Sequence, residues 1–382
     1  MTAAIGPDYG FGLYVHWPYC TRICPYCDFN VYAAKDRDRA PLVAAIIADI
    51  RAHGARLPEH KTLQSIFFGG GTPSLLSAAE MSRIIEASND TFDLAQGIEI
   101  TLESNPNDVL RDNPDDWLNA GINRLSLGVQ SLQDEALTFL GRDHDSNAAR
   151  RAVDRALATF DNLSIDMIYA RPGQSPDTWA IELSRALDLG APHVSLYELT
   201  IEARTAFGKR AARGELTPMP DDDQADLYEL TQAICAERDL TAYEVSNHAR
   251  GSEFESRHNH TYWASGDWIG VGPGAHGRLT IDGLRLATEA ARRPEDYVSA
   301  TGPVETRLTQ LDTAREFLAM ALRPVSGLDL ARFERLFGQA PDTELLAQLK
   351  HQGLAHVDEN QLTLTSQGRL MADYIAGQLS PY

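Results

Sequence analysis

The segment YVHWPYCTRICPYCDF, residues 14–29, carries three of the four cysteines of the chain. Cys20, Cys24 and Cys27 follow the spacing C-x3-C-x2-C, in a loop that leaves an apolar run typical of a buried strand. This spacing allows three thiolates to converge on one metal centre. Because four cysteines in 382 residues are too few for a disulfide scaffold, we interpret the triplet as a metal site.

Three kinds of site are compatible with the triplet. A structural zinc ion usually takes four ligands, and here His16 could supply the fourth. A four-iron cluster held by three cysteines keeps one iron open to a small molecule. A redox pair of Cys24 and Cys27 would leave Cys20 unused. Cys235, more than 200 residues away in a helical pattern, is expected to be an ordinary buried thiol.

Composition and charge narrow the class of protein. With 43% hydrophobic and 23% charged residues, the chain is predicted to form a packed globular fold. The formal net charge of −20 disfavours nucleic acid and anionic membrane surfaces as partners. The apolar stretch LVAAIIA, residues 42–48, is too short to span a membrane, and MTAAIGPDYGFG at residues 1–12 lacks the pattern of a signal peptide. We therefore expect a cytoplasmic protein.

Short β-branched and aromatic runs alternate with helical patterns, which is typical of βα units. The predicted strands are residues 12–17, 63–68, 98–104, 123–130, 163–170, 193–200 and 241–246. The predicted helices between them are residues 40–53, 77–88, 134–140, 146–159, 176–189 and 221–237. The alternation favours an α/β fold with a mainly parallel sheet.

Polar or glycine-rich segments follow the early strands. They are the cysteine loop, GGGTP at residues 69–73, ESNPND at residues 103–108, and Gln130. In parallel barrels the loops at the carboxyl ends of the strands build the active site. We therefore predict a full or partial TIM-like (β/α) barrel with its functional face at that end.

The alternation fades after Gly277, where helices are expected at residues 311–322, 329–337 and 343–352, followed by a hairpin and a helix over residues 356–379. This order is compatible with a small winged-helix-like domain, although no basic recognition face indicates DNA binding. We divide the chain into a barrel, residues 1–245, a connecting region, residues 246–300, and a C-terminal domain, residues 301–382. The glycine-rich WIGVGPGAHG, residues 268–277, is expected to form a loop over the barrel mouth.

The triplet, with Tyr26 before its last cysteine and GGGTP after the next strand, resembles the radical S-adenosylmethionine (SAM) superfamily. The resemblance implies that Cys20, Cys24 and Cys27 hold a [4Fe-4S] cluster, and that SAM chelates the open iron and supplies a deoxyadenosyl radical. It also implies a set of SAM contacts: Tyr14, Tyr26, Gly70, Gly71, Thr72, Glu103, Gln130, Arg142 and Asp166. An inward carboxylate at Glu103 would offset the charge of the sulfonium. For each of these residues, a purely structural role in a turn, a core or a hydrogen bond is the alternative.

Further segments, among them YVHWPYC, FFGGGTPSLL, NRLSLGVQS and RHNHTYW, resemble the oxygen-independent coproporphyrinogen III oxidase family, and within it the HemW-type heme chaperones. The resemblance implies a C-terminal domain like that of the oxidase HemN. Oxidases of this family carry a fourth cysteine two residues after the last cluster cysteine, where this chain has Phe29. Ala170 and Arg171 replace the usual Gly and Leu of the family.

The segment RHNHTYW, residues 257–263, contains a motif that the resemblance associates with heme. The implied heme residues are His258, Asn259, Tyr262 and Trp263. Imidazole is a common axial ligand of heme iron, and aromatic rings suit a flat macrocycle. His260 and His276 are rival ligands, and a role for His258 in only tying a loop to the barrel is the alternative.

Our interpretation is a heme chaperone that binds a [4Fe-4S] cluster, SAM and heme and delivers heme to an acceptor protein. The sequence does not identify the acceptor. One alternative is a radical SAM enzyme that acts on a tetrapyrrole or another planar substrate, although Phe29 argues against coproporphyrinogen oxidation. A zinc-stabilised binding module is a weaker alternative.

Overall fold

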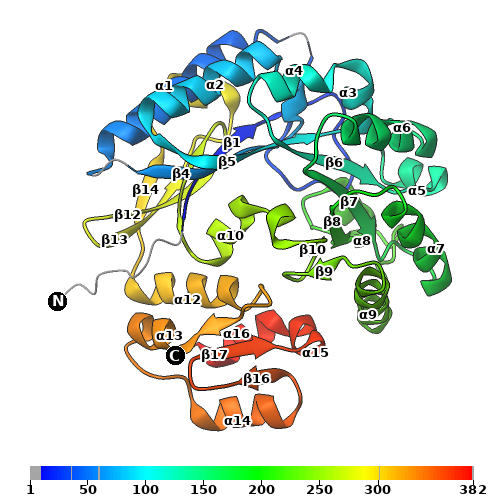
Figure 1. Ribbon diagram of the computed structural model, residues 1–382, viewed down its shortest axis with the longest axis vertical. Coiled ribbons are helices and arrows are strands. Elements are labelled where there is room, and N and C mark those ends of the chain that lie inside the picture. Colours follow the sequence, from blue (N-terminus) through cyan, green and yellow to red (C-terminus); the bar gives the residue numbers. More distant parts are fainter. Residues whose placement is uncertain (1–9, 36, 59–60, 301, 381–382) are drawn as a thin grey trace.

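A computed structural model describes residues 10–35, 37–58, 61–300 and 302–380. Its centre is a run of parallel strands that curls into a partial barrel, with helices on the outer face (Figure 1). In spatial order the parallel strands are β11 (Asp267–Val271), β1 (Phe11–Trp17), β4 (Thr62–Gly70), β5 (Asp93–Ser104), β6 (Arg124–Gln130), β7 (Leu163–Tyr169) and β8 (His193–Glu198). The predicted partial barrel and six of its predicted strands are confirmed.

The predicted helices cover the outside of this sheet (Figure 1). They are α1 (Ala40–Arg56), α2 (Ala78–Thr91), α5 (Asp134–Phe139), α6 (Ser146–Leu157), α7 (Pro176–Leu187) and α9 (Asp221–Ala236). Their starts follow local chemistry. Ser77 caps α2 in a reciprocal capping box with Glu80, and Asp145 and Ser175 accept hydrogen bonds from the first turns of α6 and α7. Short helices α3 (Pro106–Arg111) and α4 (Pro114–Asn119) were not predicted.

The strand predicted over residues 241–246 is wrong. Only β9 (Thr241–Ala242) forms, and after a turn β10 (Asn247–Ala249) pairs antiparallel with both β9 and β8. The buried carboxylate of Glu244 explains the interruption, because it accepts hydrogen bonds from the backbone N–H of Ser246 and the side chain of Asn247. These bonds close a turn where an extended strand was expected.

The predicted loop over residues 268–277 is also wrong. Its first half lies in β11, which pairs parallel with β1 and extends the barrel. A tight turn follows, with Gly272 and Gly274 at φ +100° and +78°. The sheet then continues antiparallel through β12 (His276–Ile281), β13 (Leu284–Glu289) and β14 (Val304–Arg307). The high glycine content of this segment concealed its strand character.

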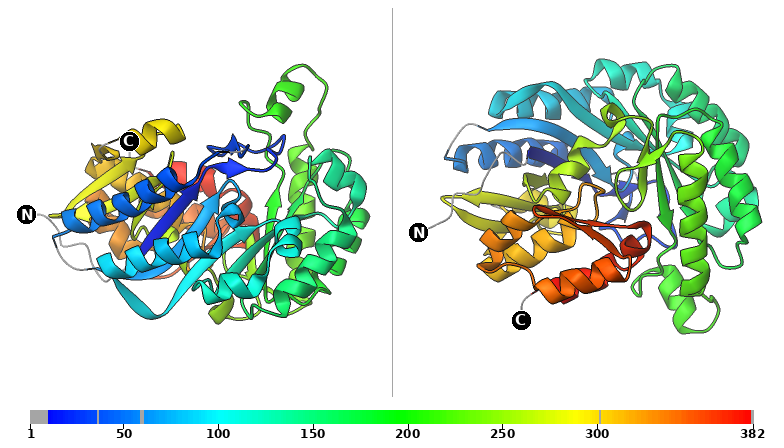
Figure 2. Two further views of the ribbon diagram at one scale, coloured as in Figure 1. Left: turned by 90° about the horizontal axis from the view of Figure 1, so that it is seen from above. Right: turned by 60° about the horizontal axis from the view of Figure 1, so that its bottom comes forward.

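A smaller domain follows and packs around its own apolar core, which includes Phe317, Phe333, Leu362 and Ile375. Its elements are α12 (Gln310–Ala321), β15 (Leu328–Asp329), α13 (Leu330–Phe337), α14 (Thr343–His351), β16 (Ala355–Val357), β17 (Gln361–Leu364), α15 (Ser366–Leu370) and α16 (Ala372–Leu379). The predicted order of three helices, a hairpin and a helical end is confirmed, while the exact domain boundaries stay predictions. This domain lies beside α10 (Arg257–Trp263) (Figures 1 and 2). Within the described residues, no helix is long and apolar enough to cross a membrane.

Candidate functional site

A cavity of about 770 Å³ opens at the carboxyl ends of the parallel strands. With one exception, Trp263, every residue predicted to bind a cofactor lines it. Those residues are Tyr14, Cys20, Cys24, Tyr26, Cys27, Gly70, Gly71, Thr72, Glu103, Gln130, Arg142, Asp166, His258, Asn259 and Tyr262. The prediction that polar strand ends would converge on one site is thus confirmed, while the role of each residue stays a prediction.

The two ends of the cysteine loop are held together at its base. Two short parallel strands, β2 (Tyr19–Cys20) and β3 (Tyr32–Ala33), join its ends, and the N–H of Cys27 donates to the carbonyl of Cys24 at 3.2 Å. All four cysteines are free thiols. Burial raises the pKa of the Cys20 thiol to about 11. A cation at the site would lower that pKa again, because metal binding requires the thiolate.

Two glycines, Gly70 and Gly71, lie in the cavity wall beside the cysteine loop. A Cβ atom at Gly71 would lie 3.0 Å from the sulfur of Cys20 and 2.8 Å from the carbonyl of Tyr19, so a side chain is excluded there. Gly70, at φ +106°, also needs to be glycine. The helix α8 (Ala206–Ala212) braces the loop from outside, because the N–H of Phe207 donates to the carbonyl of Pro25 at 2.9 Å (Figure 2).

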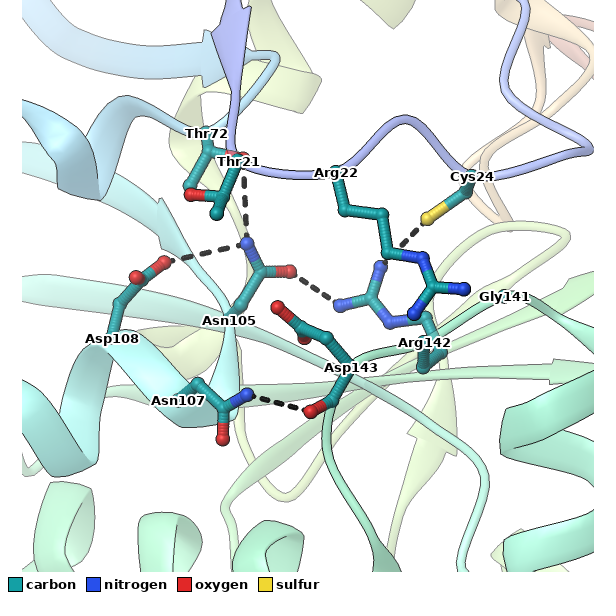
Figure 3. A pocket seen from close by; sticks show the side chains of 10 residues that line it. All are labelled: Thr21, Arg22, Cys24, Thr72, Asn105, Asn107, Asp108, Gly141, Arg142 and Asp143. Atoms are coloured by element: carbon teal, nitrogen blue, oxygen red, sulfur yellow. Dashed lines mark hydrogen bonds between the residues drawn. The ribbon is translucent and has the colours of Figure 1, made fainter. Parts of the chain in front are cut away.

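Arg142 places a half-buried positive charge beside the cysteine loop (Figure 3). Its Nη1 donates to the sulfur of Cys24 at 3.3 Å, and its Nη2 donates to the carbonyl of Gly128 at 3.1 Å and to the side chain of Asn105. A fixed guanidinium stabilises an anionic sulfur. Among the described residues, no group of three His, Cys, Asp or Glu is arranged to hold a metal ion. In a four-iron cluster each thiol binds a different iron, so the three sulfurs need not meet at one atom.

His16 does not serve as a fourth ligand in this arrangement. Its Nε2 donates to the carbonyl of Asn30 at 3.0 Å, and its Nδ1 consequently accepts from the hydroxyl of Tyr14 at 2.9 Å. Burial lowers the pKa of His16, which keeps the ring neutral. The alternative of a zinc site completed by His16 is contradicted by these contacts.

Two half-buried carboxylates, Glu103 and Asp166, line the cavity. Glu103 accepts a hydrogen bond from the N–H of Gly70 at 3.0 Å, and burial together with the nearby charge of Asp166 raises its pKa to about 8. Asp166 accepts from the hydroxyls of Ser126 at 2.8 Å and Ser164 at 3.0 Å. Burial also raises the pKa of Asp166. Such carboxylates suit a cationic ligand.

Gln130 is strained and incompletely bonded. It has φ +65°, a conformation that costs free energy in a non-glycine residue. Among the described residues, its buried Oε1 has no hydrogen-bond partner. A buried acceptor without a donor, at the end of a strand and in a cavity, points to a donor on a ligand.

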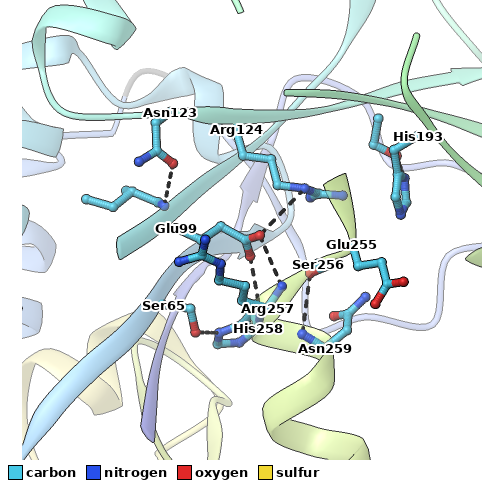
Figure 4. Close-up of polar contacts among 12 residues, drawn as sticks. Ser65, Glu99, Asn123, Arg124, His193, Glu255, Ser256, Arg257, His258 and Asn259 are labelled. Carbon is cyan, nitrogen blue, oxygen red and sulfur yellow. Dashed lines mark hydrogen bonds and ion pairs between the residues drawn. The ribbon is translucent and has the colours of Figure 1, made fainter. Parts of the chain in front are cut away.

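The helix α10 carries the predicted heme motif, and three of its residues line the cavity. Figure 4 shows the contacts at the start of this helix. The buried carboxylate of Glu99 fixes its start by accepting hydrogen bonds from the N–H of Arg257 at 3.0 Å and of His258 at 3.2 Å. Arg124 lies 3.9 Å from the same carboxylate. This arrangement joins the helix to the barrel through β5, and neither Glu99 nor Arg124 was singled out from the sequence, because each looked like an ordinary strand residue.

Both ring nitrogens of His258 are already engaged. Nδ1 lies 2.8 Å from the hydroxyl of Ser65, Nε2 lies 2.7 Å from the hydroxyl of Tyr262, and the ring stacks on Phe67. Only 1% of the residue is exposed, and burial lowers its pKa to about 3. This geometry favours the structural alternative for His258. Asn259 also lines the cavity.

Trp263 lies on the other side of α10, packed edge-on against Tyr243 and His260. The four residues predicted to bind heme are therefore not on one surface, because the helix turns Trp263 away from the cavity that His258, Asn259 and Tyr262 line. The rival His276 begins β12 and lies outside the cavity lining.

The structure explains why residues 170 and 171 differ from the Gly and Leu that are usual in the resembled family. Ala170 adopts φ +56°, which accounts for glycine at this position in the resembled family. Arg171 is buried and paired with Glu182 of α7. Neither residue lines the cavity. The replacement therefore changes the support behind the site and leaves the cavity wall intact.

Comparisons with known proteins agree with this geometry. Residues 14–183 match the Radical SAM superfamily, and residues 308–371 match the HemN C-terminal domain. Over 383 residues the chain is 35% identical to the heme chaperone HemW of Mycobacterium tuberculosis, covering 98% of this chain and 95% of that protein. It is also 35% identical over 382 residues to the mitochondrial Radical S-adenosyl methionine domain-containing protein 1 of Bos taurus, covering 94% of this chain and 85% of that protein.

Among solved structures, the coproporphyrinogen III oxidase HemN of Escherichia coli, a radical SAM enzyme, is similar with a TM-score of 0.79. The match covers 99% of this chain and 92% of the oxidase, at 23% sequence identity. This likeness shows that the two chains share a fold from the barrel through the C-terminal domain.

Proposed function

The chain belongs to the radical SAM family that includes the heme chaperone HemW, and from this premise we propose that it binds a [4Fe-4S] cluster, SAM and heme and passes heme to an acceptor protein. The observation that carries this proposal is the match to that chaperone over nearly the full length of both chains. Phe29 adds support, because it occupies the place where the resembled oxidases have a fourth cysteine.

Cys20, Cys24 and Cys27 would hold the cluster. The backbone of Gly71 lies against the first sulfur, and Arg142 donates a hydrogen bond to the second. When bound, the cluster supplies an iron that binds SAM and an electron that cleaves it. The protein contributes a buried, preshaped cavity and charges that orient the ligand.

SAM would occupy the wall between the glycines and the two carboxylates. Glu103 lies next to Gly70, and its ionised form would offset the positive sulfonium. The unpartnered acceptor of Gln130 would take a hydrogen bond from the ligand. Tyr14, Tyr26 and Thr72 complete this part of the lining.

A second candidate is a radical SAM enzyme acting on a planar substrate, and the size of the cavity favours it. About 770 Å³ is near the upper end of the usual range for small-molecule sites and leaves space beside SAM. Apolar side chains that are 44–61% exposed border this space: Ile23, Phe29 and Tyr197.

Anaerobic reconstitution of the full chain, with and without heme and SAM, tests both candidates. We expect iron-sulfur absorption, a Soret band after heme addition, and transfer of that heme to an apo-hemoprotein. C24S is expected to lose the iron-sulfur absorption, whereas C235A keeps it, because Cys235 is buried in α9 far from the triplet in sequence. Deoxyadenosine formed only with an added tetrapyrrole, without heme transfer, would favour the enzyme. The cytoplasmic location and the acceptor protein stay predictions.

A further inference from the structure

A second hollow, here called the α10 crevice, lies between α10 and the C-terminal domain. Its volume is about 490 Å³, and its walls include His260, Trp263 and Ala264 from α10 and the residue after it, and Phe317, Ala321 and Arg332 from the C-terminal domain. The helix α10 borders the cofactor cavity as well, because His258, Asn259 and Tyr262 of the same helix line that cavity. Residues of α10 therefore line two separate hollows.

His260 is the histidine of α10 that remains accessible. Its side chain is 43% exposed, and its Nε2 bonds to the carboxylate of Glu255 at 2.6 Å. Metal-binding histidines are typically oriented by a carboxylate at the second ring nitrogen in this way. Among the described residues, no hydrogen bond to Nδ1 of His260 is formed, so this nitrogen is available to a ligand.

The walls around His260 suit a flat, apolar molecule that carries negative groups at its edge. The ring of Trp263, which lines the crevice, lies 5.4 Å from the imidazole. Phe317 and Ala321 line the facing side. Arg257, an exposed residue of α10 whose Nη1 donates to the carbonyl of Gly97 at 2.7 Å, adds a guanidinium to the lining. Guanidinium groups recognise carboxylates such as those of a porphyrin.

We propose that the α10 crevice is the heme site and that His260 is the axial ligand of the heme iron. This inference rests on the proposed function, because it assigns a place to the heme that a chaperone would carry. His258, with both nitrogens engaged inside the protein, instead supports the helix that borders both the crevice and the cofactor cavity. A heme in the crevice would face the C-terminal domain and stay open to an acceptor.

Heme titration of the full chain, followed at the Soret band, tests the assignment. We expect H260A to weaken heme affinity by about tenfold or more, and E255Q to weaken it by a smaller factor through loss of ligand orientation. H276A is the matched control, since His276 lies outside the lining of both hollows. H260C is expected to shift the Soret band to that of thiolate-ligated heme, a change that misfolding would not produce.

The possible outcomes distinguish a failure of the crevice assignment from a failure of the proposed function. If the wild-type chain binds heme and neither H260A nor H260C changes affinity or spectrum, the crevice assignment is overturned and the proposed function stands. If H258A, but not H260A, abolishes the Soret band, the ligand lies in the cofactor cavity and the assignment is likewise overturned. A wild-type chain that binds no heme overturns both proposals.

Discussion

The carboxylate of Glu103 accepts a hydrogen bond from the backbone N–H of Gly70 at 3.0 Å, at the point where β4 enters the glycine turn. Burial and the neighbouring Asp166 raise the pKa of Glu103 to about 8, so at neutral pH its carboxyl group is mostly protonated. A sulfonium bound nearby would favour the ionised form. The charge of this residue is therefore coupled to the presence of the ligand.

We predict that SAM binding at pH 7 releases close to one proton from the reconstituted protein, and that this release disappears above the pKa of Glu103. Calorimetric titrations in two buffers with different ionisation enthalpies measure the released protons. E103Q keeps an acceptor for the N–H of Gly70 but has no proton to lose, so its SAM affinity should be independent of pH. Equal proton release from the wild type and E103Q would refute this role.

A second prediction concerns the contact between Arg142 and Cys24. Removing the guanidinium in R142Q takes away a positive charge and an N–H donor from the sulfur. Because both stabilise the more negative, reduced cluster, we expect the reduction potential to fall by on the order of tens of millivolts. An anaerobic redox titration followed by electron paramagnetic resonance measures the shift. R238Q is a matched control, since Arg238 is exposed and pairs with Asp188. An unchanged potential in R142Q would show that the contact does not act on the cluster.

Sequence patterns predicted the parts of the site that follow strand ends. The cysteines, Gly70 and Glu103 all lie where a β-strand meets a loop, and parallel strands bring such ends together. The same reasoning could not separate His258 from His260. Two positions apart on a helix, they face different hollows, and their bonding depends on Ser65 and Glu255, which the helix pattern does not reveal. Tertiary partners, rather than residue type, decide which imidazole is accessible.

The antiparallel half of the sheet was missed for a related reason. Glycines in residues 268–277 suggested a loop, although Gly270 pairs with Tyr14 in the parallel sheet. A Cβ at Gly270 would lie 2.1 Å from the carbonyl oxygen of His276, so the close approach of β12 requires glycine there. Backbone crowding between segments is a three-dimensional property that a pattern of single residues does not show.

The buried state of His258 predicts a specific dependence of stability on pH. Its pKa is lowered from 6.5 to about 3 in the folded chain by burial, so between these values the unfolded chain binds the additional proton. The free energy of unfolding therefore falls as the pH drops below 6.5, by up to about 2 kcal/mol at pH 5 from this residue alone. Urea unfolding of the wild type and H258Q at pH 7 and pH 5 measures the difference. We expect the loss between the two pH values to be smaller in H258Q.

Other buried histidines also lower the free energy of unfolding as the pH falls, and they do so equally in the wild type and in H258Q. Burial lowers the pKa of His53, His144 and His248 to about 4. H351Q, at the exposed end of α14, is the control and should show the wild-type loss. A loss of equal size in the wild type and H258Q would mean that His258 is protonated in the folded state at pH 5.

The ion pair between Arg171 and Glu182 gives the last prediction. The Glu182 carboxylate is buried and also accepts from the N–H of Leu132 at 2.9 Å and the amide of Gln133 at 3.1 Å. R171L would leave this carboxylate without its cation, and we expect a loss of about 3–5 kcal/mol in the free energy of unfolding. The double variant R171L/E182M removes both charges, but it also removes the acceptor of the Leu132 N–H and of the Gln133 amide, so it should recover only part of that loss. Urea unfolding of both single variants and the double variant completes a thermodynamic cycle. Additive effects in that cycle would show that the two side chains do not act as a pair.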